Sequence, residues 1–341
     1  MSEVIFTARF LVRMACFPLA SILMLMCFTF SVHAQSEEPP VFGGKWGTNG
    51  TADGQFSRPE AVAVAADGSV YVADSGNNRI QKFSADGVFL TKWGSQGTGD
   101  GQFDVPVSVA VAPDGSLYVG ESGNKRIQKF SSDGTFLTRW GPEGEFGRFF
   151  TIAVAMDGSV YVADTLNNRI KKYSSDGVFL TEWGQGFDPE GNLSCPFGIA
   201  VAADGSVYVA DTFNSRIQKY SSNGVFLARW GSRGVGDGQF GWPMAVAVAA
   251  DGSVYVADHQ FNDQKYENNR IQKFSANGTF LTKWGGYGAG DGQFYMPYDV
   301  DVASSGLVYV ADYGNSRIQY FQPQSPKPRG AFQPVLFMLL E

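Results

Sequence analysis

The stretch "GSVYVADSGNNRIQKFSADGVFLTKWG", from Gly68 to Gly94, recurs with few changes along nearly the whole chain. It combines β-branched and aromatic residues with Asp-Gly and Asn-rich turns, a pattern typical of short antiparallel strands joined by hairpins. The acidic residue before the central loop marks six copies: Asp74, Glu121, Asp164, Asp211, Asp258 and Asp312. One copy is too small to bury both faces of its own sheet, so neighbouring copies must pack against one another.

Repeats of about 40–50 residues with four strands each predict the blades of a propeller. In the first copy the strands are expected at residues 61–65, 70–73, 79–83 and 88–93. The last copy stops after three strands, near Gln322, whereas an unmatched Trp-Gly strand end, Trp46, lies near the start. We therefore predict an all-β, six-bladed β-propeller with four antiparallel strands per blade. Its N-terminal strand completes the last blade and so covers an exposed sheet edge.

The repeated segment "PEAVAVAADGSVYVADSGNNRIQKF", residues 59–83, and the "GxGDGQFxxP" pattern that follows it recur in register. In these features the chain resembles the NHL-repeat six-bladed β-propellers over about residues 41–321. The resemblance implies the fold. It leaves the activity open, because that family includes RNA-binding domains, lyases and sensor ectodomains.

An acid, an asparagine and an arginine recur around the second loop of every copy, as in Asp74, Asn77 and Arg79. An acid that closes one strand and an arginine that opens the next can lie side by side and pair bidentately. Asparagine tolerates the left-handed backbone of a tight loop. A catalytic group is needed once, whereas these residues occur in every blade, so we interpret them as structural. The "GDGQF" segments are interpreted as turns, because each offers one Asp and calcium takes 6–8 oxygen ligands.

Function is expected where the copies differ. The second loop of the fifth copy is longer than the others and begins with His259, one of the two histidines of the chain. Apolar or aromatic residues also replace Ser and Gly in neighbouring loops and junctions. We predict that a variable loop face binds a protein, a peptide or a glycan without catalysis or a cofactor. Its candidate residues are Leu166, Phe213, Trp242, His259, Phe261, Tyr266, Tyr298 and Tyr313. The alternative is that these rings pack irregular loops against the body.

Two other functions stay open. The first is a metal-dependent hydrolase or lyase, similar to the gluconolactonase-like and peptide-amidating lyase propellers, with a divalent cation such as calcium. Its candidate ligands are acids that interrupt the repeat beside the expected channel: Glu60, Asp299 and Asp301. The second is the RNA binding known for NHL repeats. A net charge of −7 argues against nucleic acid, which requires a basic face.

The N-terminal region differs in composition from the repeats. Arg9 and Arg13 precede an apolar run that ends near Ala34, which predicts a signal peptide at residues 1–34. An uncleaved membrane anchor is the alternative. We therefore expect a secreted or periplasmic protein. Its further organisation is predicted as a linker at 35–40, the propeller at 41–321, and a Pro-rich linker with an apolar tail at 322–341.

Overall fold

The computed structural model describes residues 6–8, 28–30, 37–141, 146–147, 150–185, 191–259 and 268–324. The chain divides into two compact units, residues 1–36 and residues 37–341. In the first unit, β1 (Phe6–Ala8) pairs antiparallel with β2 (Phe28–Phe30). Within the described ranges, no helix has both the length and the apolar character needed to span a bilayer.

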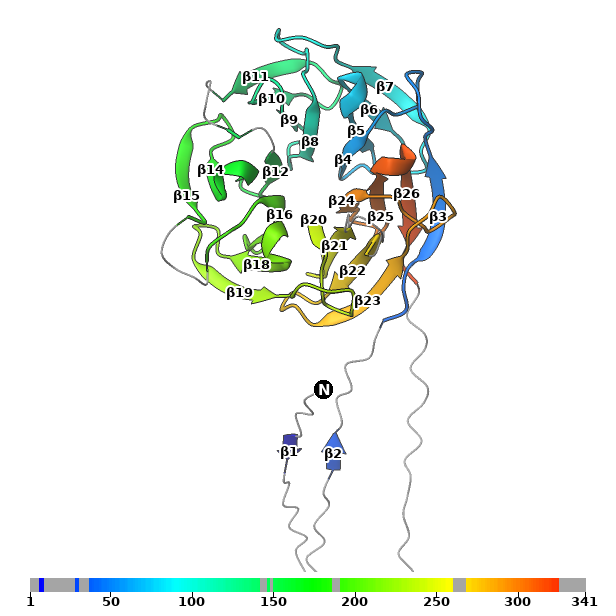
Figure 1. Cartoon of the computed structure of the whole chain (residues 1–341). Helices are drawn as coiled ribbons and strands as arrows, with labels where there is room; N and C mark the ends of the chain where they lie inside the picture. Colours follow the sequence, from blue (N-terminus) through cyan, green and yellow to red (C-terminus); the bar gives the residue numbers. More distant parts are fainter. Residues whose placement is uncertain are drawn as a thin grey trace, which may run out of the picture. The chain divides into compact units, whose positions relative to one another are not determined.

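The second unit consists of six four-stranded antiparallel sheets arranged around a central axis (Figure 1). Blades 1 and 2 contain β4 (Pro59–Val64), β5 (Val70–Asp74), β6 (Arg79–Phe83), β7 (Phe89–Trp93), β8 (Pro106–Val111), β9 (Leu117–Glu121), β10 (Arg126–Phe130) and β11 (Phe136–Trp140). Blades 3 and 4 contain β12 (Phe150–Val154), β13 (Val160–Asp164), β14 (Arg169–Tyr173), β15 (Phe179–Trp183), β16 (Pro196–Val201), β17 (Val207–Asp211), β18 (Arg216–Tyr220) and β19 (Phe226–Trp230). Blades 5 and 6 contain β20 (Trp242–Val248), β21 (Val254–His259), β22 (Arg270–Phe274), β23 (Phe280–Gly285), β24 (Pro297–Val302), β25 (Val308–Asp312), β26 (Arg317–Gln322) and β3 (Val41–Trp46). The prediction of a six-bladed β-propeller is confirmed.

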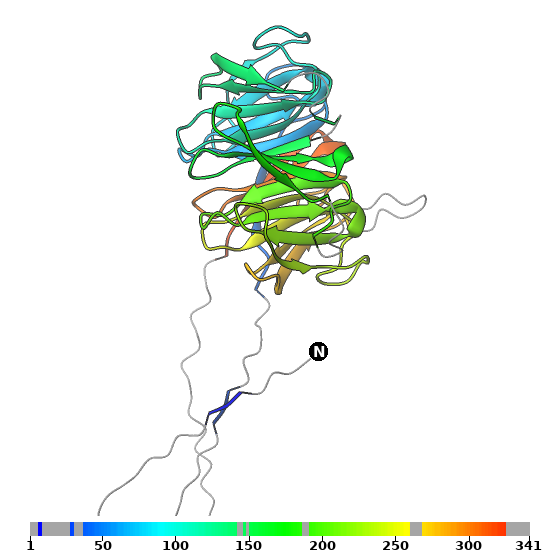
Figure 2. The same ribbon diagram turned by 90° about the vertical axis from the view of Figure 1, so that its left-hand side faces the viewer.

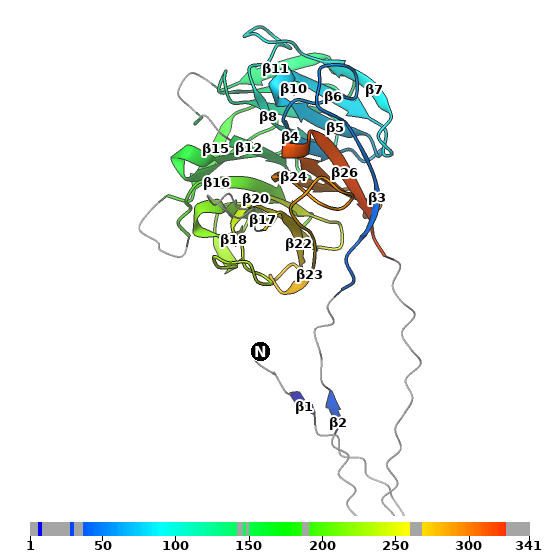
Figure 3. The same cartoon turned by 45° about the vertical axis from the view of Figure 1, so that its right-hand side comes forward.

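The ring closes by pairing the two ends of the propeller in one sheet. Strand β3 is antiparallel to β26, with Trp46 opposite Ile318, as the sequence predicts (Figure 3). A second contact fastens the same segment to blade 5, where the Glu37 amide donates to the Leu281 carbonyl at 3.0 Å. Closure therefore depends on a segment that precedes all the complete blades in the chain.

The Asp-Gly turns between the first two strands of a blade follow from local chemistry. Gly68 has a φ of +85°, which a side chain would disfavour. The Asp67 carboxylate accepts the Ser69 N–H at 2.8 Å, and this hydrogen bond lowers the pKa of Asp67. The sequence "DGS" thus supplies both the left-handed residue and the acceptor that fixes the turn.

The Trp-Gly strand ends pack neighbouring blades together. The Trp93 ring of blade 1 lies 6.0 Å from the Phe130 ring of blade 2, measured between centroids. Gly134 lets the next blade approach that indole, because a Cβ there would lie 2.6 Å from the Trp93 ring. Equivalent contacts repeat around the ring, including the seam between blades 3 and 4, which face the viewer in Figure 2. Their role is packing.

The repeated acid and arginine pair in every blade, but not in the bidentate manner expected. In blade 1 only Nε of Arg79 contacts Asp74, at 2.6 Å, and the terminal nitrogens donate to the carbonyls of Thr51, Ala52 and Gln55. The arginine therefore ties the strand pair to the incoming loop.

The repeated asparagine also has a different role from the one predicted. Asn77 ends the 3-10 turn η1 (Ser75–Asn77), and its amide donates to Asp74. The left-handed residue is the next one, Asn78, with a φ of +52°. In blade 5, where the loop is longer, Asn268 itself has a φ of +68°. The side-chain hydrogen bond, rather than backbone tolerance, is the reason for asparagine at position 77.

Candidate functional site

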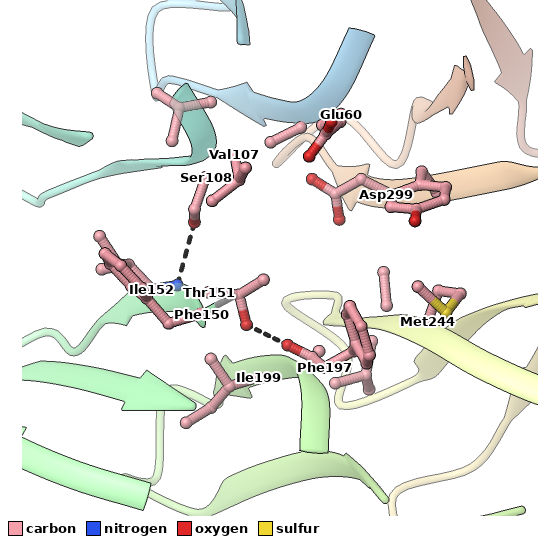
Figure 4. A pocket seen from close by; sticks show the side chains of 16 residues that line it. Glu60, Val107, Ser108, Phe150, Thr151, Ile152, Phe197, Ile199, Met244 and Asp299 are labelled. Carbon is pink, nitrogen blue, oxygen red and sulfur yellow. Dashed lines mark hydrogen bonds between the residues drawn. The ribbon is translucent and has the colours of Figure 1, made fainter. Parts of the chain in front are cut away.

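The first strand of each blade borders a small central cavity of about 60 Å³ (Figure 4). The residues at one repeat position of these strands line it, and this set is one carboxylate among apolar and aromatic side chains: Glu60, Val107, Phe150, Phe197, Met244 and Tyr298. The residues that directly follow them also line it: Ala61, Ser108, Thr151, Gly198, Ala245 and Asp299. We call this cavity the channel pocket. It has room for a few water molecules or one small terminal group, not for a drug-sized ligand.

Five of the predicted binding residues form a continuous series of ring contacts across blades 4, 5 and 6. The centroid distances are 6.3 Å from Phe213 to Trp242, 6.0 Å from Trp242 to His259 and 5.8 Å from His259 to Tyr298. Tyr298 then stacks on Tyr313 at 4.7 Å. We call these five residues the aromatic row. It leads from the exposed Phe213 to the channel pocket, which Tyr298 lines.

The other predicted binding residues lie elsewhere. Leu166 is exposed on η2 (Thr165–Asn167) of blade 3 and is not part of the aromatic row. Phe213 occupies the same place on η3 (Thr212–Asn214) of blade 4. Phe261 and Tyr266 fall outside the described residues.

A hydrogen bond that recurs between neighbouring blades is replaced by a ring contact where blade 5 meets blade 6. In blades 1, 3 and 4, a Ser or Thr follows the repeated acid, and its hydroxyl donates to a backbone carbonyl of the next blade. These hydrogen bonds run from Ser75 to Pro106 at 2.5 Å, from Thr165 to Pro196 at 2.8 Å, and from Thr212 to Pro243 at 2.7 Å. His259 and Tyr313 stand at this place in blades 5 and 6. His259 stacks on Tyr298 of blade 6 across the seam, whereas Tyr313 stacks on Tyr298 within its own blade.

His259 is an uncharged part of the aromatic row. Its side chain is almost fully buried, with the residue 3% exposed, and neither ring nitrogen has a hydrogen-bond partner among the described residues. Burial lowers the pKa of His259 to about 4, so the imidazole is neutral at physiological pH. It contributes a flat ring rather than a charge.

Glu60 lines the pocket without a bonded partner among the described residues. Its carboxylate forms neither a hydrogen bond nor an ion pair with them. Burial raises the pKa of Glu60 to about 7, and the charge of the exposed Arg58 opposes that shift. The pKa values of the Tyr298 and Tyr313 hydroxyls are raised by burial and then by the Glu60 charge. Glu60 and Tyr298 both line the channel pocket, so the carboxylate lies at the end of the aromatic row.

Asp299 and Asp301 hold blade 6 against blade 1. The Asp299 carboxylate accepts the Val62 N–H at 2.9 Å, and Asp301 accepts the Val64 N–H at 2.8 Å. Their second oxygens accept the N–H groups of Val300 and Val302. Both carboxyl groups therefore satisfy backbone donors at the inner edges of β4 and β24. This structural role was not anticipated from the sequence, where the two acids were considered as metal ligands.

Other seams use neutral side chains for the same purpose, as the dashed lines in Figure 4 show. The Ile152 N–H donates to the Ser108 hydroxyl at 3.0 Å, and the Thr151 hydroxyl donates to the Phe197 carbonyl. Among the described residues, no group of three or more His, Cys, Asp or Glu side chains is arranged to hold a metal ion. Glu60, Asp299 and Asp301 thus do not form such a group.

The buried position of Asp299 leads to a prediction about stability and pH. Burial raises the pKa of Asp299 from 3.8 to about 8, so the folded protein keeps a proton that the unfolded chain releases near pH 4. This contribution to the free energy of unfolding is lost as the pH rises from about 4 to 8. Asp299→Asn can still accept the Val62 N–H but does not titrate. As the pH rises from 5 to 8.5, we expect the free energy of unfolding of the variant to increase by about 1–3 kcal/mol relative to that of wild type.

Thermal unfolding of both proteins at pH 5 and pH 8.5 measures this difference. Asp176→Asn, the same substitution at an exposed position, serves as the control. Melting curves of Asp299→Asn and wild type that shift in parallel with pH would contradict the burial argument.

Sequence reasoning missed the apolar members of the channel pocket, Phe150, Phe197 and Met244. A signal was present, because they align with Glu60 at one position of the repeat. It also missed that His259 aligns with Ser75. The longer loop obscured this alignment.

Comparison with known proteins agrees with this architecture. The NHL repeat model matches residues 56–83, 103–130, 193–220 and 294–321. The human NHL repeat-containing protein 3 is 40% identical over 65 residues, which are 19% of this chain and 19% of that protein. The match therefore spans about a fifth of the length of this relative.

Solved structures share the fold at low identity. A protein of unknown function from Bacteroides thetaiotaomicron has a TM-score of 0.63 at 17% identity, covering 82% of this chain and 76% of its own. A gluconolactonase from Xanthomonas campestris has a TM-score of 0.56 at 14% identity, covering 85% and 99%. The chain is thus a six-bladed β-propeller with an aromatic row that leads to a central pocket. More particularly, four of its segments match the NHL repeat, so the propeller contains NHL repeats.

Proposed function

We propose that this chain is an exported, non-catalytic propeller that binds a peptide segment of a partner protein along the aromatic row. The observation that carries the proposal is the unbroken ring series from Phe213 to Tyr313, assembled from three blades. Blades 1 and 2 carry Ser and Gly in the corresponding loops. Rings held on a rigid scaffold are typical of recognition surfaces, where aromatic side chains supply most of the binding free energy. Export rests on the leader-like composition of residues 1–34.

A peptide is favoured over a glycan by charge. The chain has a net charge of −7, and the pocket at the end of the aromatic row contains Glu60. Such a surface attracts cationic ligands and repels acidic glycans. A neutral glycan stacked on Phe213 and Trp242 is the alternative outcome of the test.

Phe213→Ser is expected to weaken ligand binding at least about tenfold, because truncation of an interface aromatic typically costs more than 1 kcal/mol. Phe213 is 61% exposed, so its replacement should not disturb folding. The matched control is Leu180→Ser on the outer strand β15, where the leucine is 51% exposed. Labelled wild type and both variants would be applied to random-peptide and glycan arrays. Equal signals for Phe213→Ser and wild type would remove the binding site from the aromatic row.

Glu60 supports a second candidate, a hydrolase or lyase. A carboxyl group with a pKa of about 7 suits proton transfer near neutral pH, and the fold is shared with a gluconolactonase. Hydrolysis of δ-gluconolactone, with and without added calcium, distinguishes this candidate from the binder. Turnover that is abolished in Glu60→Gln would support the enzyme.

A further inference from the structure

The channel pocket is chemically asymmetric. Glu60 and Asp299 lie on the same side of it, and Val107, Phe150, Phe197 and Met244 supply apolar walls (Figure 4). Both oxygens of Asp299 already accept backbone N–H groups, from Val62 and Val300. The Glu60 carboxylate has no such donor among the described residues. Glu60 is therefore the polar group of this pocket that is available to a ligand.

A half-buried carboxylate without a partner is costly, and a positively charged group is what best compensates for it. Arg58 is near in sequence, but it is exposed and forms no ion pair with Glu60 among the described residues. Calcium would need 6–8 oxygen ligands, and Glu60 offers one carboxyl group. An organic cation requires only one counter-charge and a suitable wall.

The wall beside Glu60 is aromatic. Tyr298 lines the pocket together with Glu60, and Tyr313 stacks on Tyr298 at 4.7 Å. Aromatic rings attract alkylammonium groups and pack against methylene chains. A cavity of about 60 Å³ accepts a compact ammonium group more readily than a planar guanidinium group.

We infer that the channel pocket receives the ammonium group of a lysine side chain, with Glu60 as its counter-charge and the Tyr298 ring beside it. This inference rests on the proposed function and specifies its ligand as a lysine-containing peptide. The aromatic row binds the residues that flank the lysine, and the pocket selects the lysine itself.

The test uses two small probes, Nα-acetyl-lysine methylamide and the same compound acetylated on Nε, which removes the positive charge. Each is titrated into the full chain at pH 8, where the Glu60 carboxyl is ionised, and binding is followed by NMR. We expect the charged probe to bind at least about tenfold more tightly than the neutral one. Glu60→Gln should abolish that preference, whereas Asp176→Asn, an exposed change of equal charge, should preserve it.

Three outcomes are informative. Loss of the preference in Glu60→Gln, together with an unchanged melting temperature, supports the inference. Equal binding of both probes to wild type, or an unchanged preference in Glu60→Gln, overturns it. Array binding that depends on Phe213 but not on Glu60 would overturn the lysine pocket while leaving the proposed function in place.

Discussion

A chain that begins at residue 47 is expected to lose the folded monomer, whereas a chain that begins at residue 37 keeps the stability of the full protein. The first truncation removes β3 and so leaves β26 as an uncovered edge. It also removes the Trp46 ring, whose centroid lies 5.6 Å from Phe83 of blade 1 and 6.1 Å from Tyr309 of blade 6. Trp46 is partly buried, so the loss of its ring by itself costs less than the about 3–5 kcal/mol of a fully buried Trp. The strand ladder is lost in addition, and the open edge favours aggregation.

Size-exclusion chromatography and thermal unfolding of the two truncated chains measure this effect. The chain from residue 37 is the matched control, because it lacks the first compact unit but retains β3 and the Glu37 contact with Leu281. A synthetic peptide of residues 37–46 should partly restore the shorter chain. A stable monomer from residue 47 would show that β3 does not hold the ring closed.

Arg126→Ala is expected to lower the free energy of unfolding by about 3–5 kcal/mol, because it leaves a buried carboxylate without its counter-charge. Nε of Arg126 lies 2.6 Å from Glu121, and its terminal nitrogens donate to the carbonyls of Thr98, Gly99 and Gln102. The Glu121 side chain is completely buried. Removal of Arg126 therefore also leaves loop carbonyls without donors inside the blade.

Arg139→Ala in the same blade is the control. Arg139 pairs with Asp100 at 2.8 Å, but its side chain is 45% exposed, and an exposed pair contributes at most about 1 kcal/mol. Urea unfolding of both variants compares the two ion pairs directly. Similar losses in the two variants would show that the repeated arginine is no more important than a surface arginine.

The fold could be predicted because its determinants are local and repeated. Gly68 in its Asp-Gly turn specifies one hairpin, and Trp46 in its Trp-Gly strand end specifies one contact between blades. With six such copies, a propeller is the arrangement that buries every sheet. The aromatic row could be predicted in part for the opposite reason. Phe213, Trp242 and Tyr313 were recognisable because they depart from the repeat.

The roles of Asp299 and Asp301 could not be predicted in this way. Their partners, Val62 and Val64, lie at the other end of the chain, and only ring closure brings the inner strands of blades 6 and 1 together. The placement of His259 between Trp242 and Tyr298 also depends on the packing of blade 5 against blade 6. A side chain that departs from the repeat is visible in the sequence, but its contacts are not.

The sequence by itself determined the blade, the number of blades and the strand that completes the last one, because hydrogen-bonding turns and alternating apolar residues act over short distances. Only the tertiary structure decided which irregular side chains meet. Five rings come together in the aromatic row, Asp299 and Asp301 accept hydrogen bonds from backbone N–H groups, and Glu60 has no partner among the described residues of the channel pocket. Contacts between blades depend on the geometry of the closed ring, which no single repeat encodes.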